Sequence, residues 1–580
     1  MAYTDEEILK NYERWCTDSY FDEDTRAELL AIEGDEKEIR ERFYTDLSFG
    51  TGGMRGIMGA GTNRMNVYTV GKAAQGLANL IKKENGCGRG AVIAHDSRHM
   101  SRELAEAAAL CLAANCIRVY MFDSLRPTPE LSFAVRHLGC IAGAVVTASH
   151  NPAEYNGFKV YWEDGAQITY PKDEEIMAEI SAVKSLGDVR TTTAAEAEAA
   201  GLYAVIGAET DDRYIEAVKS LVLEPEAVKK EAENLRIVYT PLHGTGNIPV
   251  RRILGELGFE NVYVVPEQEK PDGAFPTVSS PNPEDPGAFR LALELAEKTD
   301  ADLVLATDPD ADRLGVYAKD RDGRYKPFTG NMIGALLCAY RLGRLREKGM
   351  LPENGAVVTT IVSGRLGRRI ARDMGADVIE TLTGFKYIGE QIKRFEEDGS
   401  HEFLFGYEES YGCLAGTYAR DKDAAAAVTM LCEAAAYYRE RGSSLPEQLR
   451  ELYERCGFYK EELYTVTMSG IEGAAQIRAV MDRVRSDPPK RIGGYETEVF
   501  CDYLKDIRIA GGEASQTGLP RSNVLYFGMP EDTWCCIRPS GTEPKIKLYM
   551  GVRGDSPEEA EEKLGRFKKA VLGLLSPPGV

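Results

Sequence analysis

The sequence lacks paired cysteine motifs, membrane-spanning runs and an excess of basic charge. Its 12 cysteines are dispersed along 580 residues without a CxxC pair, which argues against a disulfide framework and favours a reducing compartment. No uncharged apolar run is long enough to cross a bilayer, and the first residues are acidic where a signal peptide would be basic. We therefore expect a cytoplasmic protein with neither a secretion signal nor a membrane anchor.

Acidic residues outnumber basic residues in the chain as a whole. The 70 Lys and Arg residues face 92 Asp and Glu residues, which gives a formal net charge of -22. Such a surface disfavours nucleic acid and anionic membranes as main partners. A small anionic ligand would need a local basic pocket, and the sequence leaves the oligomeric state open between monomer and dimer.

What the chain does contain is an alternation of short apolar runs with helical stretches, the pattern of βαβ units with parallel strands. With 43% hydrophobic residues it can bury large cores, but its length exceeds what one core organises. The pattern recurs three times and predicts three similar α/β domains followed by a smaller α+β domain. The predicted domains cover residues 1–205, 206–325, 326–455 and 456–580.

Each predicted domain has its own strand candidates. The first has strands at 91–95, 118–122 and 143–147 and a helix at 102–117, the second has strands at 236–239, 261–265 and 301–306, and the third has strands at 356–362, 376–381 and 402–405. In the last domain, strands at 497–503 and 545–550 precede a helix at 557–575. Loops rich in Gly, Ser, Asp or Glu directly follow a strand in each α/β domain, where open α/β sheets place their ligands.

The first such loop follows the strand at 143–147 and displays the Ser149 hydroxyl and the His150 imidazole. Asn151 and Pro152 prevent a helix from starting, so the loop is fixed and can hold a nucleophile. Taken alone, it is equally consistent with an ordinary polar turn. A serine hydrolase is disfavoured because the GxSxG elbow is absent and His150, adjacent to Ser149 in the chain, is badly placed as its base.

A strand at 157–162 follows this loop, and the turn signal at 164–165 predicts a hairpin with a return strand at 166–170. Alternation along the strand places Lys159 on the face opposite its apolar neighbours. Lys159 is therefore a candidate for proton transfer or phosphate contact near Ser149. Without the neighbouring loop, a solvated lysine would be the better interpretation.

The second loop carries Asp308, Asp310 and Asp312 directly after an apolar strand. Three carboxylates at this spacing repel one another unless a cation lies among them, and hard oxygen ligands point to Mg²⁺. An EF-hand is excluded because Arg313 and Lys319 stand where that loop needs Gly and Glu. We interpret the segment as a metal site.

The same segment also resembles the nucleophile loop of haloacid-dehalogenase-type phosphatases, with Asp308 as the nucleophile. That motif normally lies near the start of its domain and continues to Thr or Val. Here a third aspartate follows, which favours the metal interpretation and leaves a phosphatase as an alternative.

Two further loops carry polar side chains suited to a phosphorylated sugar. Glu408 and Ser410, in a polar turn at 405–412, offer acceptors and a hydroxyl to a polyol. The segment at 535–547 offers a phosphate cradle, formed by Arg538, Ser540, Gly541 and Thr542. This cradle would supply the basic pocket that an acidic chain requires.

A glycine-rich stretch at 49–59 matches neither a Walker A loop nor a dinucleotide fingerprint. Its glycines permit tight turns that can bring Arg55 into a cleft. No nucleotide is implied.

Together, these loops in this order resemble the α-D-phosphohexomutase superfamily over nearly the whole chain. Supporting stretches are RPTP at 126–129, TPLHGTG at 240–246, PNPE at 281–284 and TGFK at 383–386. The family fold has three α/β domains and a C-terminal domain around a central active-site cleft, in agreement with the four domains expected above. The fine pattern is most similar to the bacterial phosphoglucomutases of this superfamily.

The resemblance implies a role for each candidate residue. Ser149 would carry the phosphoryl group, and Asp308, Asp310 and Asp312 would hold one Mg²⁺ per active site, with Ser149 or its phosphate as the remaining ligand. Lys159 and Arg55 would assist proton and phosphoryl transfer. The implied substrate contacts are His150, Arg313, Lys386, Glu408 and Ser410, with Arg538, Ser540, Gly541 and Thr542 on the non-reacting phosphate.

The implied activity is the interconversion of α-D-glucose 1-phosphate and glucose 6-phosphate through a phosphoserine, with glucose 1,6-bisphosphate as intermediate and activator. Many phosphomannomutase/phosphoglucomutases have a histidine just after the sugar loop, whereas this chain has Ser410-Tyr411-Gly412, which favours glucose. A small-molecule sugar phosphate is the expected partner. Phosphomannomutase, phosphopentomutase, sugar-phosphate phosphatase and a non-enzymatic sugar-phosphate sensor remain alternatives.

Overall fold

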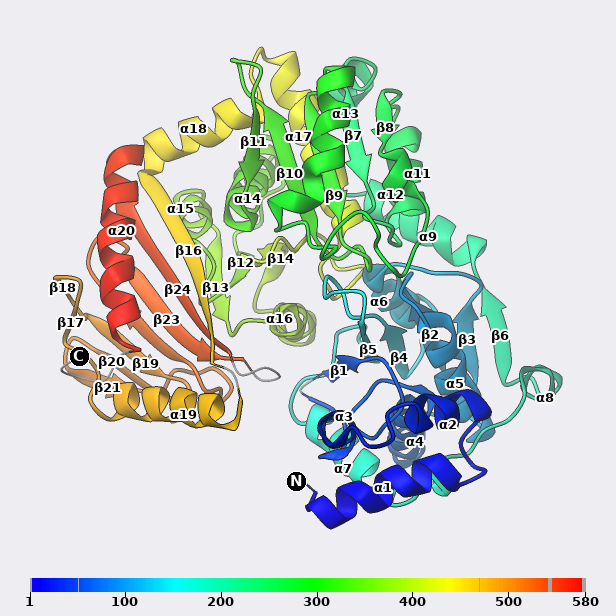
Figure 1. Ribbon diagram of the computed structural model, residues 1–580. Coiled ribbons are helices and arrows are strands. Elements are labelled where there is room, and N and C mark those ends of the chain that lie inside the picture. Colours follow the sequence, from blue (N-terminus) through cyan, green and yellow to red (C-terminus); the bar gives the residue numbers. More distant parts are fainter. Residues whose placement is uncertain (1–2, 51, 469, 541–544, 576–580) are drawn as a thin grey trace. The chain divides into compact units, whose positions relative to one another are not determined.

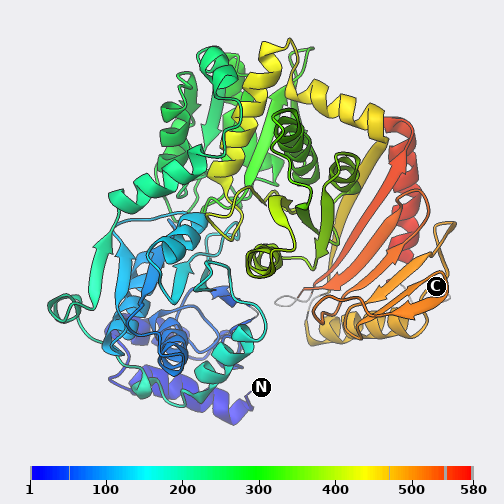
Figure 2. The same cartoon turned by 180° about the vertical axis from the view of Figure 1, so that it is seen from behind.

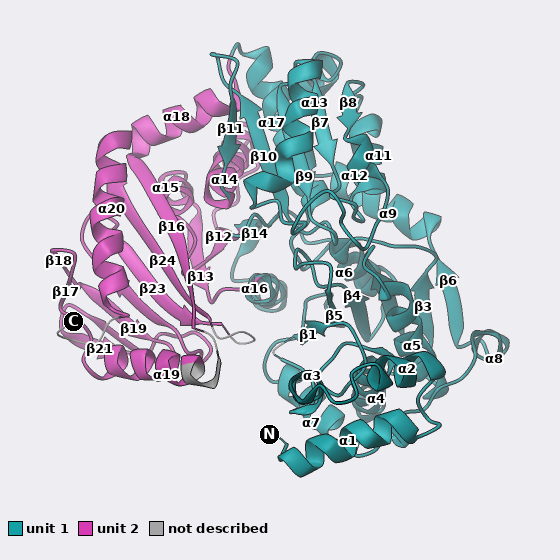
Figure 3. Ribbon diagram, viewed as in Figure 1, with its two compact units in different colours: residues 1–329, 385–406, 410–442 teal, residues 330–384, 407–409, 443–580 magenta. Residues whose placement is uncertain are grey.

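The computed structural model describes residues 3–50, 52–468, 470–540 and 545–575. The chain forms two compact units (Figure 3). Unit 1 contains Met1–Thr329, Phe385–Gly406 and Ser410–Gly442, and unit 2 contains Gly330–Gly384, Tyr407–Glu409 and Ser443–Val580.

The first sheet of unit 1 has six strands in the order β1-β5-β4-β2-β3-β6 (Figure 1). Five of them run in the same direction, and β5 is antiparallel to both of its neighbours, β4 and β1. The strands are β1 (Gly53–Ile57), β2 (Ala91–His95), β3 (Val119–Phe122), β4 (Ala142–Val146), β5 (Tyr155–Trp162) and β6 (Tyr203–Ile206). The predicted central strands are thus present, within a residue or two of the expected bounds.

Helices cover both faces of this sheet, so every residue of β2 and β4 is buried. Ile93 of β2 packs in one core with α4 and α5, whereas its neighbour Val92 packs in a second core with α6. This alternation follows from the period of two along a strand. The helices are α4 (Val67–Lys83), α5 (Ser101–Ala114), α6 (Thr128–His137), α7 (Lys172–Ala182) and α8 (Ala194–Ala199).

The predicted return strand at 166–170 is wrong. Only an isolated bridge between Tyr161 and Gln167 is present. Because β1 and β4 already occupy both edges of β5 over most of its length, the returning chain can pair only near its end.

Three helices precede the first sheet and form a small core of their own: α1 (Asp5–Thr17), α2 (Glu23–Leu30) and α3 (Glu36–Phe43). Thr4 begins α1 with a capping box to Glu7, as expected for an acidic helical opening. Trp15 and Phe43 are buried in this core, where the ring of Trp15 meets that of Phe43 edge-on at 5.8 Å and that of Tyr68 of α4 at 5.4 Å.

The second sheet of unit 1 has the order β11-β10-β9-β7-β8. β9, β7 and β8 are parallel, and β10 and β11 continue the sheet as antiparallel strands. The strands are β7 (Ile237–Thr240), β8 (Val262–Val264), β9 (Leu303–Thr307), β10 (Leu314–Lys319) and β11 (Tyr325–Phe328). The remaining helices of unit 1 are α9 (Ala208–Lys219), α10 (Pro225–Glu231), α11 (Asn247–Glu256), α12 (Pro266–Glu269), α13 (Arg290–Thr299), α16 (Phe385–Asp398) and α17 (Ala424–Glu440).

Unit 2 begins with a parallel pair of strands, β12 (Gly355–Thr360) and β13 (Asp377–Thr381), linked by a helical crossover. The crossover helix α15 (Arg365–Asp373) packs against α14 (Gly330–Glu347). Two further strands of the third predicted domain belong, except for Tyr407, to unit 1: β14 (Glu402–Tyr407) and β15 (Cys413–Leu414).

The C-terminal part of unit 2 is an antiparallel sheet of seven strands in the order β16-β24-β23-β22-β19-β20-β21. Helix α20 (Pro557–Gly573) lies along its two longest strands, β16 and β24 (Figures 1 and 2). The strands are β16 (Phe458–Thr467), β19 (Val499–Asp502), β20 (Ile507–Ala510), β21 (Glu513–Ser515), β22 (Leu525–Gly528), β23 (Trp534–Pro539) and β24 (Lys545–Gly554). The unit also contains α18 (Leu445–Cys456), α19 (Gly470–Ser486) and the small pair β17 (Arg491–Ile492) and β18 (Tyr495–Glu496).

The predicted fold class, α/β with a C-terminal domain of a different type, is confirmed. The domain boundaries near 205, 325 and 455 stay predictions. Across the described residues, the helices are all too short or too polar to cross a membrane.

Candidate active site

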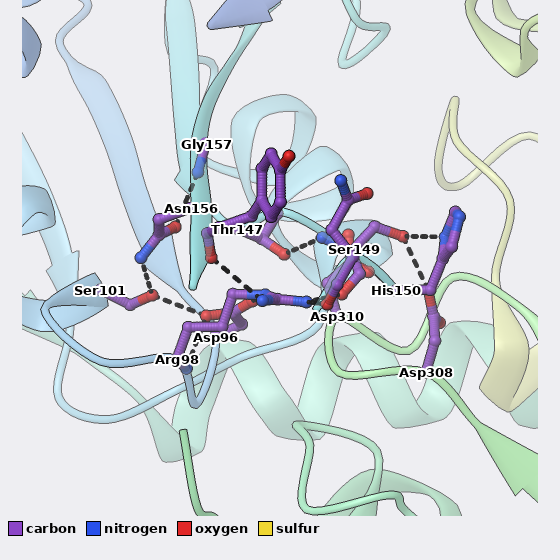
Figure 4. Close-up of polar contacts among 12 residues, drawn as sticks. Asp96, Arg98, Ser101, Thr147, Ser149, His150, Asn156, Gly157, Asp308 and Asp310 are labelled. Carbon is purple, nitrogen blue, oxygen red and sulfur yellow. Dashed lines mark hydrogen bonds and ion pairs between the residues drawn. The ribbon is translucent and has the colours of Figure 1, made fainter. Parts of the chain in front are cut away.

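Ser149 lies in the loop after β4, and its side chain points at the aspartate loop of the second sheet (Figure 4). Its hydroxyl donates a hydrogen bond of 2.8 Å to Asp308 Oδ2, although the two residues belong to different sheets. The backbone of Ser149 has φ +51°, a left-handed conformation that residues other than glycine rarely adopt. With 2% of its surface exposed, Ser149 is enclosed by protein on nearly every side.

The three aspartates after β9 form a buried cluster. Their carboxylate oxygens lie within 4.8 Å of one another, and within the part of the chain that the structure describes no other group of three acidic, His or Cys ligands comes so close. Asp308 Oδ1 accepts from the backbone N–H groups of Asp312 at 3.1 Å and Arg313 at 3.0 Å. By contrast, Asp310 Oδ1 is buried and accepts no hydrogen bond from any residue that the structure describes.

This donor set fits Mg²⁺. Hard carboxylate oxygens are the ligands that Mg²⁺ prefers, and a buried oxygen without a donor is costly unless a cation contacts it. Burial and then the negative charges of Asp312 and Asp310 raise the pKa of Asp308 well above its usual value. A divalent cation among the three carboxylates would remove that repulsion.

Two lysines contact the aspartate cluster. Lys159 of β5 places Nζ 2.8 Å from Asp310 Oδ2, as its predicted orientation requires. Burial alone would raise the pKa of Asp310, but the ammonium groups of Lys159 and Lys422 and the hydroxyl of Thr128 together lower that pKa. Lys422, in the segment before α17, lies with Nζ 2.7 Å from Asp312 Oδ2.

Sequence reasoning missed Lys422. The available signal was the run Arg420-Asp421-Lys422-Asp423, a charged cluster directly before an alanine-rich helix. In the structure Asp423 caps α17, and Asp421 accepts a hydrogen bond of 2.7 Å from Tyr161 of β5. The run therefore joins the first sheet to the aspartate loop.

Other residues fix the aspartate loop from both sides. Thr128, at the start of α6, donates its backbone N–H to Asp310 O at 2.9 Å and its hydroxyl to Asp310 Oδ2 at 2.8 Å. On the other side, the N–H of Thr245 donates to Pro309 O at 2.9 Å. A Cβ on Gly244 would lie 2.5 Å from Pro309 Cα, so only glycine fits there.

Arg55 and His150 flank Ser149. Arg55 of β1 is paired with Gly157 of β5, and its Nη1 donates to Asn151 Oδ1 at 2.9 Å. His150 Nδ1 lies 3.3 Å from Ser149 Oγ, which corrects the expectation that the imidazole is badly placed. The left-handed turn at Ser149 brings the two adjacent side chains together.

The charge state of His150 follows from its surroundings. Burial lowers the pKa of His150 well below its usual value, and the positive charges of Arg313 and Arg55 lower it further. The imidazole is therefore neutral near pH 7. Arg313 pairs with Glu284 at 2.5 Å, and Ser280 donates to His150 O at 2.7 Å.

The predicted sugar-binding residues lie on the third domain. Glu408 is buried and accepts a hydrogen bond of 2.9 Å from the N–H of Gly384. Its neighbour Glu409 accepts from the Thr360 hydroxyl at 3.1 Å. Ser410 is half-buried in the next turn of chain.

Lys386 belongs to the first turn of α16. Burial lowers the pKa of Lys386, with Asp173 and Glu390 opposing that change. Such an ammonium, partly desolvated, suits an anionic or strongly polar ligand.

The predicted phosphate cradle lies at the end of the β23–β24 hairpin in unit 2. Arg538 is paired with Lys547 across the two strands, and the N–H of Ser540 donates to Lys545 O at 2.8 Å. Three cations therefore gather at this end of the sheet, as an anion site requires. Gly541 and Thr542 lie outside the described residues.

Family models match three consecutive parts of the chain. They are phosphoglucomutase/phosphomannomutase alpha/beta/alpha domain I at residues 46–186, domain II at 212–323 and domain III at 329–456, together more than half of the chain. The chain belongs to the phosphoglucomutase/phosphomannomutase family. The predicted membership of the α-D-phosphohexomutase superfamily is confirmed, and the protein is a mutase of this family.

Individual relatives agree with this family. The chain is 38% identical over 534 residues to a phosphoglucomutase of Staphylococcus epidermidis, covering 91% of this chain and 94% of the relative. It is 37% identical over 533 residues to a phosphoglucomutase of Staphylococcus aureus, covering 91% and 93%.

Solved structures share the fold at lower identity. Parafusin, a phosphoglucomutase of Paramecium in its open form, has a TM-score of 0.68 at 18% identity, over 92% of this chain and 95% of that one. A phosphoglucomutase/phosphomannomutase family protein of Burkholderia thailandensis has a TM-score of 0.63 at 19% identity, over 92% and 98%.

Proposed function

We propose that the protein interconverts α-D-glucose 1-phosphate and glucose 6-phosphate by lending a phosphoryl group from Ser149 and recovering it. One observation carries this proposal: the Ser149 hydroxyl lies 2.8 Å from Asp308 Oδ2, in a buried cluster of three carboxylates. A serine in an ordinary polar turn has no reason to face three anions. The choice of glucose is supported by phosphoglucomutase relatives at 37–38% identity.

Asp308, Asp310 and Asp312 would hold Mg²⁺, which when bound supplies positive charge beside the phosphoryl group on Ser149. Phosphoryl transfer needs little covalent work from side chains, so catalysis is mainly alignment and charge stabilisation. Lys159 and Arg55 supply further positive charge next to the Ser149 loop.

The reaction is balanced by two transfers. In the first, the bond between phosphorus and Ser149 Oγ breaks, a bond to the sugar O6 forms, and the proton of the 6-hydroxyl passes to Ser149 Oγ. The bisphosphate then turns around, the bond between phosphorus and O1 breaks as the phosphoryl group passes to Ser149 Oγ, and O1 takes up the proton that Oγ gives up. Glucose 1,6-bisphosphate is therefore both intermediate and activator.

The remaining predicted residues bind substrate in this proposal. Glu408 accepts hydrogen bonds from sugar hydroxyls, and Ser410 accepts from them or donates to them. Lys386, Arg313 and His150 contact the ligand around the reacting phosphate. Arg538 and Ser540 hold the phosphate that is not reacting, and Lys547 adds charge to that site.

A coupled assay tests the proposal. Glucose, mannose, glucosamine and ribose 1-phosphates are supplied with and without a trace of glucose 1,6-bisphosphate, and 6-phosphate formation (5-phosphate for ribose) is compared with release of inorganic phosphate. We expect fastest turnover on glucose 1-phosphate, phosphate on Ser149 by mass spectrometry, and no turnover for Ser149→Ala. Preference for another sugar would reassign the substrate. Net phosphate release that survives Ser149→Ala would instead identify a phosphatase using Asp308.

A further inference from the structure

The guanidinium of Arg98 is buried beside the Ser149 loop and hydrogen-bonds several backbone carbonyl groups of that loop (Figure 4). Its side chain is 0% exposed. The two terminal nitrogens donate to the carbonyl oxygens of Ser149 at 2.6 Å, Pro152 at 2.8 Å and Tyr155 at 3.0 Å, and to that of Asn151. Four carbonyl groups of one loop thus converge on a single buried cation.

Asp96 holds Arg98 in place. The end of β2 lies beside the end of β4, because these strands are parallel neighbours, and Asp96 is the next residue after β2. Its Oδ1 accepts from the Arg98 N–H at 2.9 Å and the Ser101 hydroxyl at 2.6 Å, while Oδ2 lies 3.4 Å from Arg98 Nε. A buried guanidinium needs such an anion, since an unpaired buried charge is strongly unfavourable.

Thr147 holds the other side of Ser149. The Ser149 N–H donates to Thr147 Oγ1 at 2.8 Å. The N–H of Ser149 is therefore fixed by Thr147, and its carbonyl is fixed by Arg98, which Asp96 holds in place. Both peptide groups of a residue with φ +51° are fixed by this arrangement.

Arg98 also contacts the domain that carries the aspartate cluster. Its Cζ lies 5.0 Å from the ring centroid of Phe275, a cation–π contact. A Cβ on Gly273 would lie only 2.4 Å from His99 N, so this turn packs directly on the chain after Arg98. The group that fixes the Ser149 loop is thereby fixed to the second domain as well.

We propose that Arg98 and Asp96 are positioning residues for phosphoryl transfer, which hold Ser149 in the left-handed conformation that points its hydroxyl at Asp308. The inference rests on the proposed function of Ser149 and goes beyond it. Without these contacts the serine relaxes toward the commoner backbone conformations, and Oγ turns away from the cluster. Because neither residue belongs to the proposed sugar or phosphate sites, the loss falls on kcat rather than KM.

The first test compares Arg98→Lys and Arg98→Met with a matched control, Arg485→Met. Arg485 is also a buried arginine, paired with Asp502 at 3.1 Å, but it belongs to the C-terminal sheet domain. A lysine keeps the charge of Arg98 but cannot bind four carbonyl groups at once. We expect kcat to fall about tenfold for Arg98→Lys and about a hundredfold for Arg98→Met, the scale of loss seen when a reacting group is displaced by about 1 Å.

KM should stay within about threefold of wild type in both Arg98 variants, because substrate binding is untouched. Phosphorylation of Ser149 by glucose 1,6-bisphosphate, followed by intact mass, should slow in parallel with kcat. Arg485→Met should lower the unfolding midpoint while keeping kcat per folded molecule.

A second pair of variants removes the risk that Arg98→Met fails to fold. Thr147→Val loses the hydroxyl that accepts from the Ser149 N–H but keeps the shape of the side chain, and Thr147→Ser keeps the hydroxyl. We expect Thr147→Val to lose kcat about tenfold and Thr147→Ser to recover most of it. Wild-type kcat in folded Arg98→Lys and Thr147→Val would overturn the positioning role. Mutase activity in Ser149→Ala would instead contradict the proposed function itself.

Discussion

Lys422 Nζ lies 2.7 Å from Asp312 Oδ2, although the lysine belongs to the segment before α17 and the aspartate follows β9. Lys159 approaches the neighbouring Asp310 at 2.8 Å from a third segment, β5. Two ammonium groups thus neutralise part of the charge of three buried carboxylates. Any divalent cation bound by these aspartates must compete with that positive charge.

We predict that Lys422→Met strengthens Mg²⁺ binding and weakens catalysis. Removing an ammonium 2.7 Å from a metal ligand reduces repulsion of Mg²⁺, so the apparent Kd for Mg²⁺ should fall severalfold in calorimetric titration. At saturating Mg²⁺, kcat should still fall by about tenfold or more, because charge beside the phosphoryl group is lost. Lys422→Arg, which keeps the charge, should restore metal affinity to the wild-type level. An unchanged Kd in Lys422→Met would show that the ammonium moves away when the metal binds.

The sequence predicted those residues of the site that are marked by the residues next to them in the chain. Ser149 and the three aspartates were identified because each follows a short apolar run, and such runs mark strand ends. The contacts of Lys422, Thr128 and Arg98 depend on segments that are distant in the chain. The charged run at 420–423 marks Lys422, but no local pattern shows which residues these three side chains contact.

The errors have the same origin. The return strand at 166–170 failed because β1 already pairs with β5, which the hairpin signal alone does not show. His150 was judged badly placed as a base for Ser149 because the two residues are adjacent in the chain, and the left-handed φ of Ser149 brings their side chains together. Local chemistry suggested a polyol contact for Glu408 and a phosphate cradle for Arg538, and the family resemblance then gave each a specific role.

Metal removal gives a second prediction. If Asp308, Asp310 and Asp312 hold Mg²⁺ in the folded state only, adding Mg²⁺ at about a hundred times its Kd should stabilise the protein by about 2.7 kcal/mol. Chelation should reverse this gain and abolish turnover. Asp310→Asn should lose most of the Mg²⁺-dependent rise in unfolding midpoint. The control is Asp322→Asn, an exposed aspartate on the turn after β10, which should respond to Mg²⁺ as wild type does.

Glu461 of β16 gives a third prediction, on the pH dependence of stability. Burial raises the pKa of Glu461 to about 7, although hydrogen bonds from Asn331 and the backbone of Arg365 oppose that change. Between the unfolded value of 4.5 and about 7, the folded protein keeps a proton that the unfolded chain has lost. The contribution of Glu461 to the free energy of unfolding therefore falls as pH rises through this window, by about 1.4 kcal/mol per pH unit. Above the window this contribution stays constant.

Glu461→Gln should remove this pH dependence. As pH rises from 5 to 8, the unfolding midpoint of this variant should rise relative to that of wild type. Glu462→Gln is the matched control, because the carboxylate of Glu462 is adjacent in the chain but partly exposed and paired with Lys568. The difference between its unfolding midpoint and that of wild type should not grow in the same way as pH rises. A constant difference between Glu461→Gln and wild type across this pH range would refute the buried-proton explanation.

The phosphate cradle gives a fourth prediction. Arg538 and Lys547 face each other across β23 and β24, and we assign them to the non-reacting phosphate of the substrate. Charge-assisted hydrogen bonds of this kind contribute about 1.5–3 kcal/mol each, so Arg538→Met should raise KM for glucose 1-phosphate by about tenfold to a hundredfold.

Phosphorylation of Ser149 by a small donor without a second phosphate, such as acetyl phosphate, should proceed in Arg538→Met as in wild type, because that donor has nothing for the cradle to bind. Arg508→Met is the control, since Arg508 is exposed on β20 of the same sheet. Its KM should be unchanged. A wild-type KM in Arg538→Met would remove the cradle from the substrate site, and slower reaction with acetyl phosphate would place Arg538 at the reacting phosphate instead.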